Sequence, residues 1–290
     1  MYGMRSEIKQ IIVSGIREIS GIAHNNFHTF SCNFWRFTTM EKVKISAVSY
    51  LNTKPFIYGL EHSGFVNEIE LSLDMPSLCA AKLIEGKVDV GLVPVAVIPL
   101  IPGAEIISDY CIGARGPVRT VVLVSNVPLE EVDTIILDYQ SRTSVMLARV
   151  LARFFWKKEV KWLNGEPGYH TRDIKGKTAA VVIGDRVFEI DGQYPHVYDL
   201  SQEWAKYTGL DFVFACWTAN KPLSEEFKKA LNEALAVGIN NMPDVIKKIA
   251  PQYPAYNLAE YYSRDISYPL DASKRKGLEL FWKYAEKLES

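Results

Sequence analysis

From Met40 onward the chain alternates between strand-like and helix-like segments, and this alternation constrains the fold more than any other feature. The segment 88–94 (VDVGLVP) is apolar almost throughout, which is typical of a strand buried on both faces of a parallel sheet. The segment 133–138 (DTIILD) reads in the same way, and the amphipathic segment 141–156 that follows it predicts a helix. Strands that alternate with helices in this manner predict an α/β fold.

The order of the segments predicts two lobes. We expect a first lobe over 40–126 together with 217–290, and a second lobe over 127–216. The chain is expected to leave the first lobe near Ser125–Leu129 and to return near Cys216–Pro222, so that two crossings form a hinge. Ligands of such sheets bind at the carboxyl ends of the strands, which places a ligand in the cleft between the lobes.

Residues 1–39 differ in character from the rest of the chain. They show no helical or strand period, and the apolar run 11–16 is too short and too closely flanked by charge for a signal peptide. We expect a poorly ordered N-terminal extension or a misplaced start codon, with a functional arm as the alternative. We expect no export signal.

The composition excludes several classes of partner. Lys and Arg number 33 against 34 Asp and Glu, a formal net charge of −1, so no electrostatic footprint for nucleic acid or an anionic membrane is present. No apolar run approaches the roughly 18 residues of a membrane span. The four cysteines are scattered without metal-ligand or disulfide spacing, which favours a reduced, cytoplasmic setting.

Nucleotide, metal and serine-hydrolase motifs are also missing. The sequence contains no GxGxxG after its first strand, no GxxxxGK[ST], no HExxH and no GxSxG. We therefore expect a protein that acts on a small molecule without a cofactor and without a metal, and we assign no oligomeric state.

Three hydroxyls gather at the start of the helix that follows Asp138. Ser141, Thr143 and Ser144 fall where free backbone N–H groups and the helix dipole attract an anion. We interpret them as donors to a substrate carboxylate. Plain N-capping, which needs one hydroxyl, is the alternative.

Two further polar segments follow strands of the first lobe. The motif SYLNTKP brings Ser49, Tyr50 and Asn52 to the end of the first strand, where a cleft is expected. A polar loop before a helix explains the same residues. Pro76 and Ser77 open a helix and predict a second anion site, with an ordinary helix start as the alternative.

Isolated charged residues supply the remaining candidates. Arg115 lies in a turn and can pair with a carboxylate in bidentate fashion, or it is a solvated turn arginine. Asp185 follows an apolar strand and faces the cleft, or it is a turn residue. His170 and His196 lack a readable partner, and we expect both at the surface.

Six segments together resemble the chorismate dehydratases of the futalosine route to menaquinone, the MqnA family. They occur in order as VSYLNTKP (48–55), DMPSLCAAKLIEGKVDVGLVPVA (74–96), SDYCIGARGPVRTVVLVS (108–125), LDYQSRTSVMLARVL (137–151), VVIGDRVF (181–188) and DLSQEWAKYTGLDFVFACW (199–217). The resemblance covers about residues 42–288. The SRTS helix start and the IGARGPVRT turn are its most specific parts.

The resemblance implies a periplasmic-binding-protein type II fold used as a cytoplasmic enzyme. It implies a hydro-lyase that removes water from chorismate to give 3-(1-carboxyvinyloxy)benzoate, without a cofactor. It also suggests that the enolpyruvyl carboxylate of the substrate removes the ring proton. Asn52 matches the asparagine of the family's first motif, and we assign it hydrogen bonds that orient the substrate. Asp185 is the alternative base.

Two other functions remain open on the sequence. The first is 1,4-dihydroxy-6-naphthoate synthase of the same pathway, whose family uses a histidine in the second lobe that this sequence does not convincingly supply. The second is a non-catalytic solute-binding protein, which would need an export signal. The effector domain of a transcription factor would need a helix-turn-helix, for which 39 residues are too few.

Overall fold

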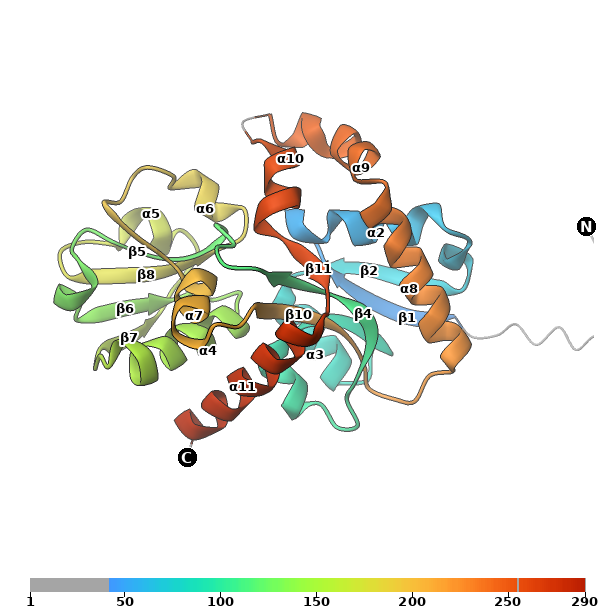
Figure 1. Ribbon diagram of the computed structural model, residues 1–290, viewed down its shortest axis with the longest axis horizontal. Helices are drawn as coiled ribbons and strands as arrows, with labels where there is room; N and C mark the ends of the chain where they lie inside the picture. Colours follow the sequence, from blue (N-terminus) through green and yellow to red (C-terminus); the bar gives the residue numbers. More distant parts are fainter. Residues whose placement is uncertain (1–41, 255, 290) are drawn as a thin grey trace, which may run out of the picture. The chain divides into compact units, whose positions relative to one another are not determined.

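Two mixed β-sheets organise the protein (Figure 1). This computed structural model describes residues 42–254 and 256–289, so the predicted extension 1–39 lies outside the described residues. The expected two-lobed α/β fold is confirmed. In the part of the chain that the structure describes, no helix is long and apolar enough to cross a membrane.

The first sheet has six strands in the order β11-β4-β10-β3-β1-β2. β1 pairs in parallel with β2 and β3, whereas β10 runs antiparallel to β3 and β4. The parallel strands are joined by helices, as right-handed crossovers require. The strands are β1 (Val43–Val48), β2 (Ile69–Asp74), β3 (Val90–Pro94), β4 (Glu105–Ala114), β10 (Phe212–Ala219) and β11 (Ser267–Pro269).

The second sheet has five strands in the order β7-β6-β8-β5-β9. β6 pairs in parallel with β7 and β8, and β5 runs antiparallel to β8 and β9. The strands are β5 (Val121–Ser125), β6 (Thr134–Leu137), β7 (Lys161–Asn164), β8 (Thr178–Ile183) and β9 (His196–Asp199). We call residues 42–114 and 212–289 lobe one and residues 121–208 lobe two.

The two crossings lie earlier in the chain than the sequence predicts. β5 belongs to the second sheet, so the first crossing is 115–120 and not Ser125–Leu129. The whole of β10 belongs to the first sheet, so the return is 209–211 and not Cys216–Pro222. The predicted boundaries at 126 and 216 are therefore wrong by several residues. A fully apolar strand can pack in either sheet, so its pairing partners determine the lobe to which it belongs.

One half-buried carboxylate joins the two crossings. Asp199 caps helix α7 (Leu200–Thr208) by accepting the N–H groups of Ser201 and Gln202 at 3.0 Å. Its other oxygen accepts the N–H groups of Val118 and Arg119 at 2.9 and 2.6 Å. One side chain thus fixes the backbone of the first crossing and the helix that leads into the second.

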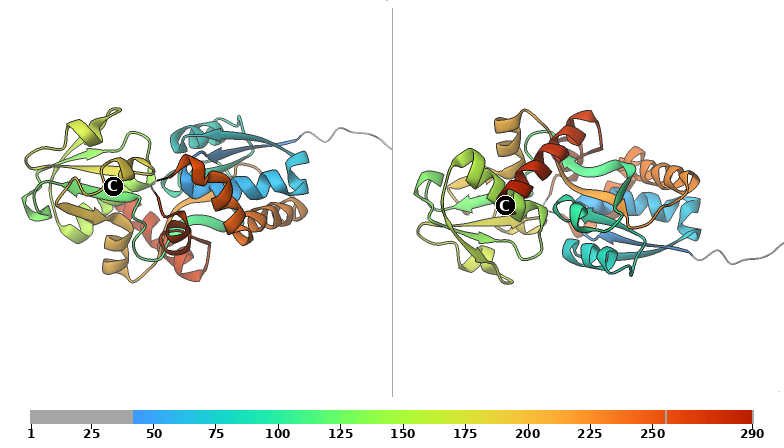
Figure 2. Two further views of the ribbon diagram at one scale, coloured as in Figure 1. Left: turned by 90° about the horizontal axis from the view of Figure 1, so that it is seen from above. Right: turned by 90° about the horizontal axis from the view of Figure 1, so that it is seen from below.

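The helices cover both sheets and link them. The longest, α11, packs against β10 of lobe one and α4 of lobe two, and Figure 2 shows it passing from one lobe toward the other. The α-helices are α2 (Lys54–His62), α3 (Pro76–Ile84), α4 (Thr143–Val150), α5 (Tyr169–Arg172), α6 (Arg186–Glu189), α7, α8 (Glu225–Asn240), α9 (Met242–Ile249), α10 (Leu258–Glu260) and α11 (Ala272–Glu289). Short 3-10 and π-helical turns are η2 (Leu51–Thr53), η3 (Gly64–Asn67), η4 (Val95–Leu100), η5 (Leu129–Glu131), η6 (Leu151–Trp156), η7 (Ala250–Gln252) and η8 (Tyr261–Asp265).

A pair of glycines lets α2 and α8 pack closely (Figure 1). A Cβ on Gly238 would lie 1.7 Å from the carbonyl oxygen of Pro55, and one on Gly59 would lie 2.1 Å from that of Ala234. Both helices therefore approach each other backbone to backbone, which only glycine permits.

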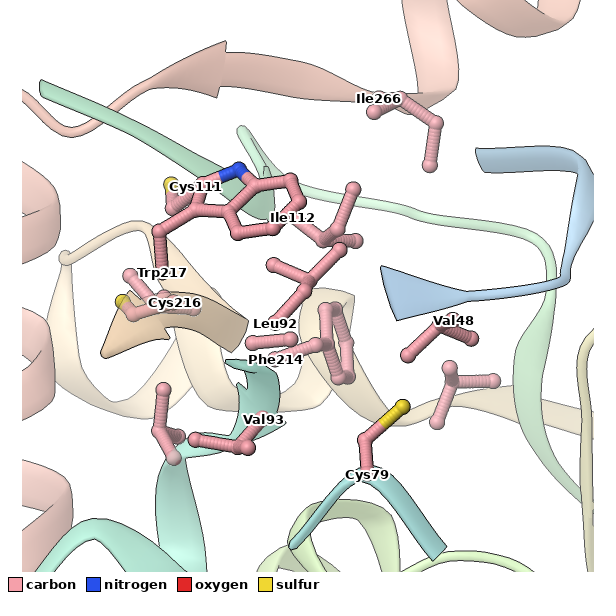
Figure 3. Close-up of a cluster of buried hydrophobic side chains, with 14 of the residues drawn as sticks. Val48, Cys79, Leu92, Val93, Cys111, Ile112, Phe214, Cys216, Trp217 and Ile266 are labelled. Carbon is pink, nitrogen blue, oxygen red and sulfur yellow. The ribbon is translucent and has the colours of Figure 1, made fainter. Parts of the chain in front are cut away.

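The main core continues up to the cavity described below. Val48, Ile112 and Phe214 belong to the large cluster of buried apolar side chains and also line that cavity (Figure 3). Close packing behind these residues holds the floor of the cavity rigid.

The start of α11 carries a buried charge. Asp271 accepts the N–H of Lys274 at 3.0 Å and so caps the helix, and it also pairs with Arg115 at 2.7 Å. The ammonium of Lys274 is fully buried and lies 3.3 Å from Asp271 and 2.8 Å from the hydroxyl of Ser267. Hydrogen bonds to this carboxylate lower the pKa of Asp271 to about 2, against the desolvation that raises it.

Asp271→Ala is expected to lower the free energy of unfolding by about 2 kcal/mol at pH 7, because it removes a helix cap and one charge-assisted bond. The folded-state pKa lies below the unfolded value, so this stabilisation is present above about pH 4 and is lost as the pH falls toward 2. Urea titrations at several pH values measure both effects. Asp109→Ala, which removes an exposed partner of Arg275 at 3.7 Å, is the control and should change little. Equal effects of the two variants would contradict this account.

Candidate active site

A cavity lies between the lobes. Strand ends, the crossing 115–120 and two helix starts line it. The lining residues are Val48, Tyr50, Asn52, Thr53, Pro76, Pro94, Ile112, Val118, Thr120, Val121, Ser141, Thr143, Ser144, Ile183, Gly184, Phe214 and Ala215. The predicted position of a ligand between the lobes therefore coincides with a real cavity.

The wall of the cavity is largely apolar, and its polar groups are uncharged. Within the described residues, its lining contains hydroxyls, one phenol and one amide, and no carboxylate, amine, guanidinium, imidazole or thiol. Such a wall binds an anion through N–H and O–H donors and helix dipoles, without a cationic side chain. In the same part of the chain, no cluster of His, Cys, Asp and Glu side chains suits a metal ion.

The start of α4 contributes Ser141, Thr143 and Ser144, as predicted. Ser141 accepts the backbone N–H of Ser144 at 3.0 Å, which is the capping role that the sequence left open. The hydroxyl of Thr143 donates to Phe214 O at 3.0 Å and accepts the N–H of Ala96 at 3.2 Å, so it joins α4 to lobe one. The hydroxyl of Ser144 is bonded to no group in the described chain and is therefore the freest donor of the three.

Asp138 fixes the loop that leads into α4. It is fully buried and accepts the N–H groups of Gln140 and Ser141 at 2.8 and 3.0 Å. The guanidinium of Arg186 lies 2.6 Å from its other oxygen, and the phenol of Tyr169 donates to the same oxygen at 2.7 Å. Every lone pair of the carboxylate is thus used within lobe two.

The turn η2 presents Asn52 to the cavity. Two tyrosines of the C-terminal segment anchor the turn, Tyr262 on Leu51 O at 2.7 Å and Tyr268 on Asn52 O at 2.8 Å. The hydroxyl of Thr53 donates to the side-chain carbonyl of Asn52 at 3.1 Å. No group in the described part of the chain takes up the side-chain NH2, so this amide offers donors to a ligand.

Tyr50 connects the cavity wall with lobe two. Its phenol donates to the side-chain carbonyl of Gln140 at 2.5 Å, and Arg186 donates to the same oxygen at 3.2 Å. Burial raises the pKa of Tyr50 to about 12, although the charge of Arg186 acts in the opposite direction. The ring packs over Gly184, where a Cβ would lie 3.4 Å from it and where φ is +62°.

Four predicted site residues do not line the cavity. Ser49 is exposed and Ser77 is half-buried beside Pro76, which does line it. Arg115 is 63% exposed and pairs with Asp271 instead of facing the cavity. Asp185 accepts the phenol of Tyr253 at 3.2 Å, and its burial raises its pKa against the effects of Tyr253, the N–H of Leu51 and Lys54.

Several positions differ from the sequence-based expectations or were not predicted at all. His170 is 5% exposed and lies 2.9 Å from Glu189, so its expected surface position is wrong. Gln140 and Arg186 stand beside Ser141 and Asp185, two positions the sequence did single out, yet their contacts cross long sequence separations. Thr120 lies in a crossing that the sequence placed elsewhere, and so it was not a candidate.

The two sheets, the double crossing and the cavity between the lobes are those of a periplasmic-binding-protein-like fold. A protein of Archaeoglobus fulgidus has this fold with a TM-score of 0.68 at 14% identity, covering 86% of this chain and 98% of that one. The periplasmic aliphatic sulphonate binding protein SsuA of Escherichia coli has a TM-score of 0.53 at 13% identity, covering 86% and 92%. These likenesses establish the fold alone.

Sequence comparison identifies the family to which the chain belongs. A family profile described as menaquinone biosynthesis matches residues 43–287, so the chain belongs to this menaquinone biosynthesis family. The chain is also 25% identical over 201 residues to a protein of Thermus thermophilus named chorismate dehydratase, covering 61% of this chain and 71% of that one.

Proposed function

We propose that the protein is a chorismate dehydratase, a hydro-lyase that converts chorismate into 3-(1-carboxyvinyloxy)benzoate and water in menaquinone biosynthesis. Membership of the menaquinone family and the similarity to the Thermus protein support it. The observation that carries it is the pair of helix starts on one cavity. Pro76 of α3 comes from lobe one, and Ser141, Thr143 and Ser144 at the start of α4 come from lobe two.

Chorismate carries two carboxylates, and the two helix starts match that number. A helix N-terminus carries about half a positive charge, which favours a bound anion. At α3, Pro76 has no N–H and the N–H groups of Leu78 and Cys79 bond Met75 O, so the N–H of Ser77 and the helix dipole would act on the anion there. One carboxylate is bound at each lobe in this arrangement, and binding both favours the closed arrangement of the lobes. Closure removes water from the site and strengthens these contacts.

The reaction removes the ring hydrogen at the ether-bearing carbon and the neighbouring hydroxyl. The ring carboxylate activates this hydrogen through the conjugated diene, and aromatisation supplies the driving force. Electrons neither enter nor leave, so the step needs no redox cofactor. We propose that the substrate's enolpyruvyl carboxylate takes the proton, because no basic side chain lines the cavity of the described chain.

Asn52 is the proposed orienting residue. Its free NH2 group donates to the substrate, and its position is fixed by Thr53 and Tyr268. An amide is too weak a base to accept the proton itself. Asp185 remains the alternative base, although its hydrogen bond from Tyr253 favours a contact between the lobes.

We further propose a cytoplasmic location and chorismate as the small-molecule partner. Cys79, Cys111 and Cys216 are buried thiols, and no disulfide joins the described residues. Cys111 and Cys216 lie opposite each other in β4 and β10 and form no disulfide. Neighbouring cysteines without a disulfide suit a reducing compartment.

Binding and product analysis together test the proposal. Calorimetry is expected to show saturable chorismate binding, and mass spectrometry of the same mixture should show an aromatic product lighter than chorismate by one water. Chorismate that binds and is recovered unchanged would indicate a solute-binding protein. Absence of both binding and product would remove chorismate as the substrate.

A further inference from the structure

Loss of water from chorismate requires a proton donor as well as a base. The ring hydroxyl leaves as hydroxide unless a group protonates it, and hydroxide is a poor leaving group. General acids commonly accelerate such steps by 10²–10⁴-fold. The enolpyruvyl carboxylate takes its proton from the ether-bearing ring carbon. If this proton is removed while the hydroxyl departs, a second group must donate a proton to the hydroxyl.

Tyr50 is the most acidic group on the cavity wall. The other lining donors of the described chain are aliphatic hydroxyls and one amide, which are far weaker acids than a phenol. Tyr50 lies between β1 and η2 in lobe one and donates to Gln140 in lobe two, so its side chain is held in this position only when the lobes are together.

The contacts of Tyr50 allow its proton to move. Gln140 Oε1 accepts from Tyr50 at 2.5 Å and from Arg186 at 3.2 Å. When the phenol turns its proton to a leaving hydroxyl, Gln140 still keeps the hydrogen bond from Arg186. The amide therefore releases Tyr50 without leaving a buried acceptor unpaired.

Arg186 is held near the phenol of Tyr50, where a phenolate would form. The buried Asp138 holds it at 2.6 Å, and the ring of Tyr139 lies 5.1 Å from its guanidinium carbon. One guanidinium nitrogen, Nη1, is buried and has no partner among the described residues. Burial raises the pKa of Tyr50 to about 12, whereas the charge of Arg186 opposes this shift and favours the ionised phenol.

We propose that Tyr50 is the general acid that protonates the departing hydroxyl, with Gln140 and Arg186 as its positioning residues. This inference rests on the proposed dehydratase function. The enolpyruvyl carboxylate takes the ring proton, the C–O bond breaks, and the Tyr50 proton joins the hydroxide to form water. The protonated carboxyl group of the product then returns its proton to the phenolate through solvent, so the enzyme is restored and all atoms balance.

Tyr50→Phe in D2O tests the assignment. Product formation is expected to fall by about 100-fold or more, while chorismate still binds in calorimetry. Proton removal then runs ahead of hydroxyl loss, so recovered chorismate should contain deuterium at the ether-bearing ring carbon. NMR or mass spectrometry of the recovered substrate measures this exchange, and the wild-type protein should show little of it.

Tyr253→Phe is the matched control, because Tyr253 also donates a phenol hydrogen bond between the lobes, to Asp185 at 3.2 Å. If Tyr50 only holds the lobes together, both variants lose activity without deuterium in recovered chorismate, and the proposal is wrong. Unchanged product formation by Tyr50→Phe also overturns it.

A second replacement decides the matter if Tyr50→Phe fails to bind chorismate. 4-Aminophenylalanine in place of Tyr50 still donates to Gln140 but cannot supply a proton to hydroxide. It is expected to bind chorismate, to show the deuterium exchange and to form product slowly. Wild-type rates from this variant would contradict the proposal. A wild-type protein that forms no product would instead contradict the dehydratase function itself.

Discussion

Asp138→Ala is expected to lower the free energy of unfolding by about 4 kcal/mol, the largest stability effect of a single substitution in this account. The carboxylate is fully buried, and its removal leaves the guanidinium of Arg186 without its partner at 2.6 Å. It also leaves the N–H groups of Gln140 and Ser141 short of an acceptor, whereas the phenol of Tyr169 can still donate to Val181 O. An unpaired buried charge is far more costly than a lost surface contact.

Urea titration measures this loss, and Asp133→Ala is the matched control. Asp133 directly precedes β6, whereas Asp138 directly follows it. Asp133 is exposed, and among the described residues its side chain is hydrogen-bonded to Thr134 alone. Replacing Asp133 should therefore change the free energy of unfolding by under about 0.5 kcal/mol. Adding Arg186→Met to Asp138→Ala should recover part of the stability, because the unpaired charge is then gone. A loss below about 1 kcal/mol in Asp138→Ala would show that Arg186 does not depend on this carboxylate.

Asn52→Ala is expected to reduce single-turnover rates at saturating chorismate by about 100-fold, because misplaced reacting groups forfeit the advantage of orientation. The η2 turn is held by Tyr262 and Tyr268, so the backbone should stay in place when the amide is removed. The effect is therefore assigned to the lost donor and not to a collapsed turn.

Asn67→Ala, an exposed asparagine whose amide bonds Gly64 O at 3.3 Å, serves as the control and should leave the rate unchanged. Asp185→Asn separates the two candidate bases. It keeps an acceptor for Tyr253 and should do less damage than Asn52→Ala. If Asp185→Asn binds chorismate normally and is inactive, the substrate does not remove its own proton.

Most of the fold could be predicted from the sequence because the segments have strong hydrophobic patterns. Continuous apolar runs such as 88–94 predict buried strands, and β3 (Val90–Pro94) is fully buried. The strands that pair with β5 could not be predicted, because its five buried residues can pack in either sheet. Only the antiparallel pairing with β8 and β9 assigns it to lobe two.

Part of the candidate site could be predicted from the sequence. Strand ends and helix starts are positions that the sequence indicates, and Tyr50, Asn52, Pro76, Ser141, Thr143 and Ser144 all line the cavity. Side-chain direction is not encoded locally, so Arg115 was expected at the cavity but turns to Asp271. Gln140 meets Tyr50 across 90 residues, and such a contact exists only once both lobes are folded.

A single-turnover experiment tests the central claim most directly. Purified protein in excess over chorismate is quenched at intervals, and the mixture is analysed by ultraviolet absorbance and mass spectrometry. The account predicts that all of the chorismate becomes 3-(1-carboxyvinyloxy)benzoate without any added cofactor, and that Asn52→Ala slows this conversion while still binding chorismate. Quantitative recovery of unchanged chorismate from the wild-type protein would contradict it.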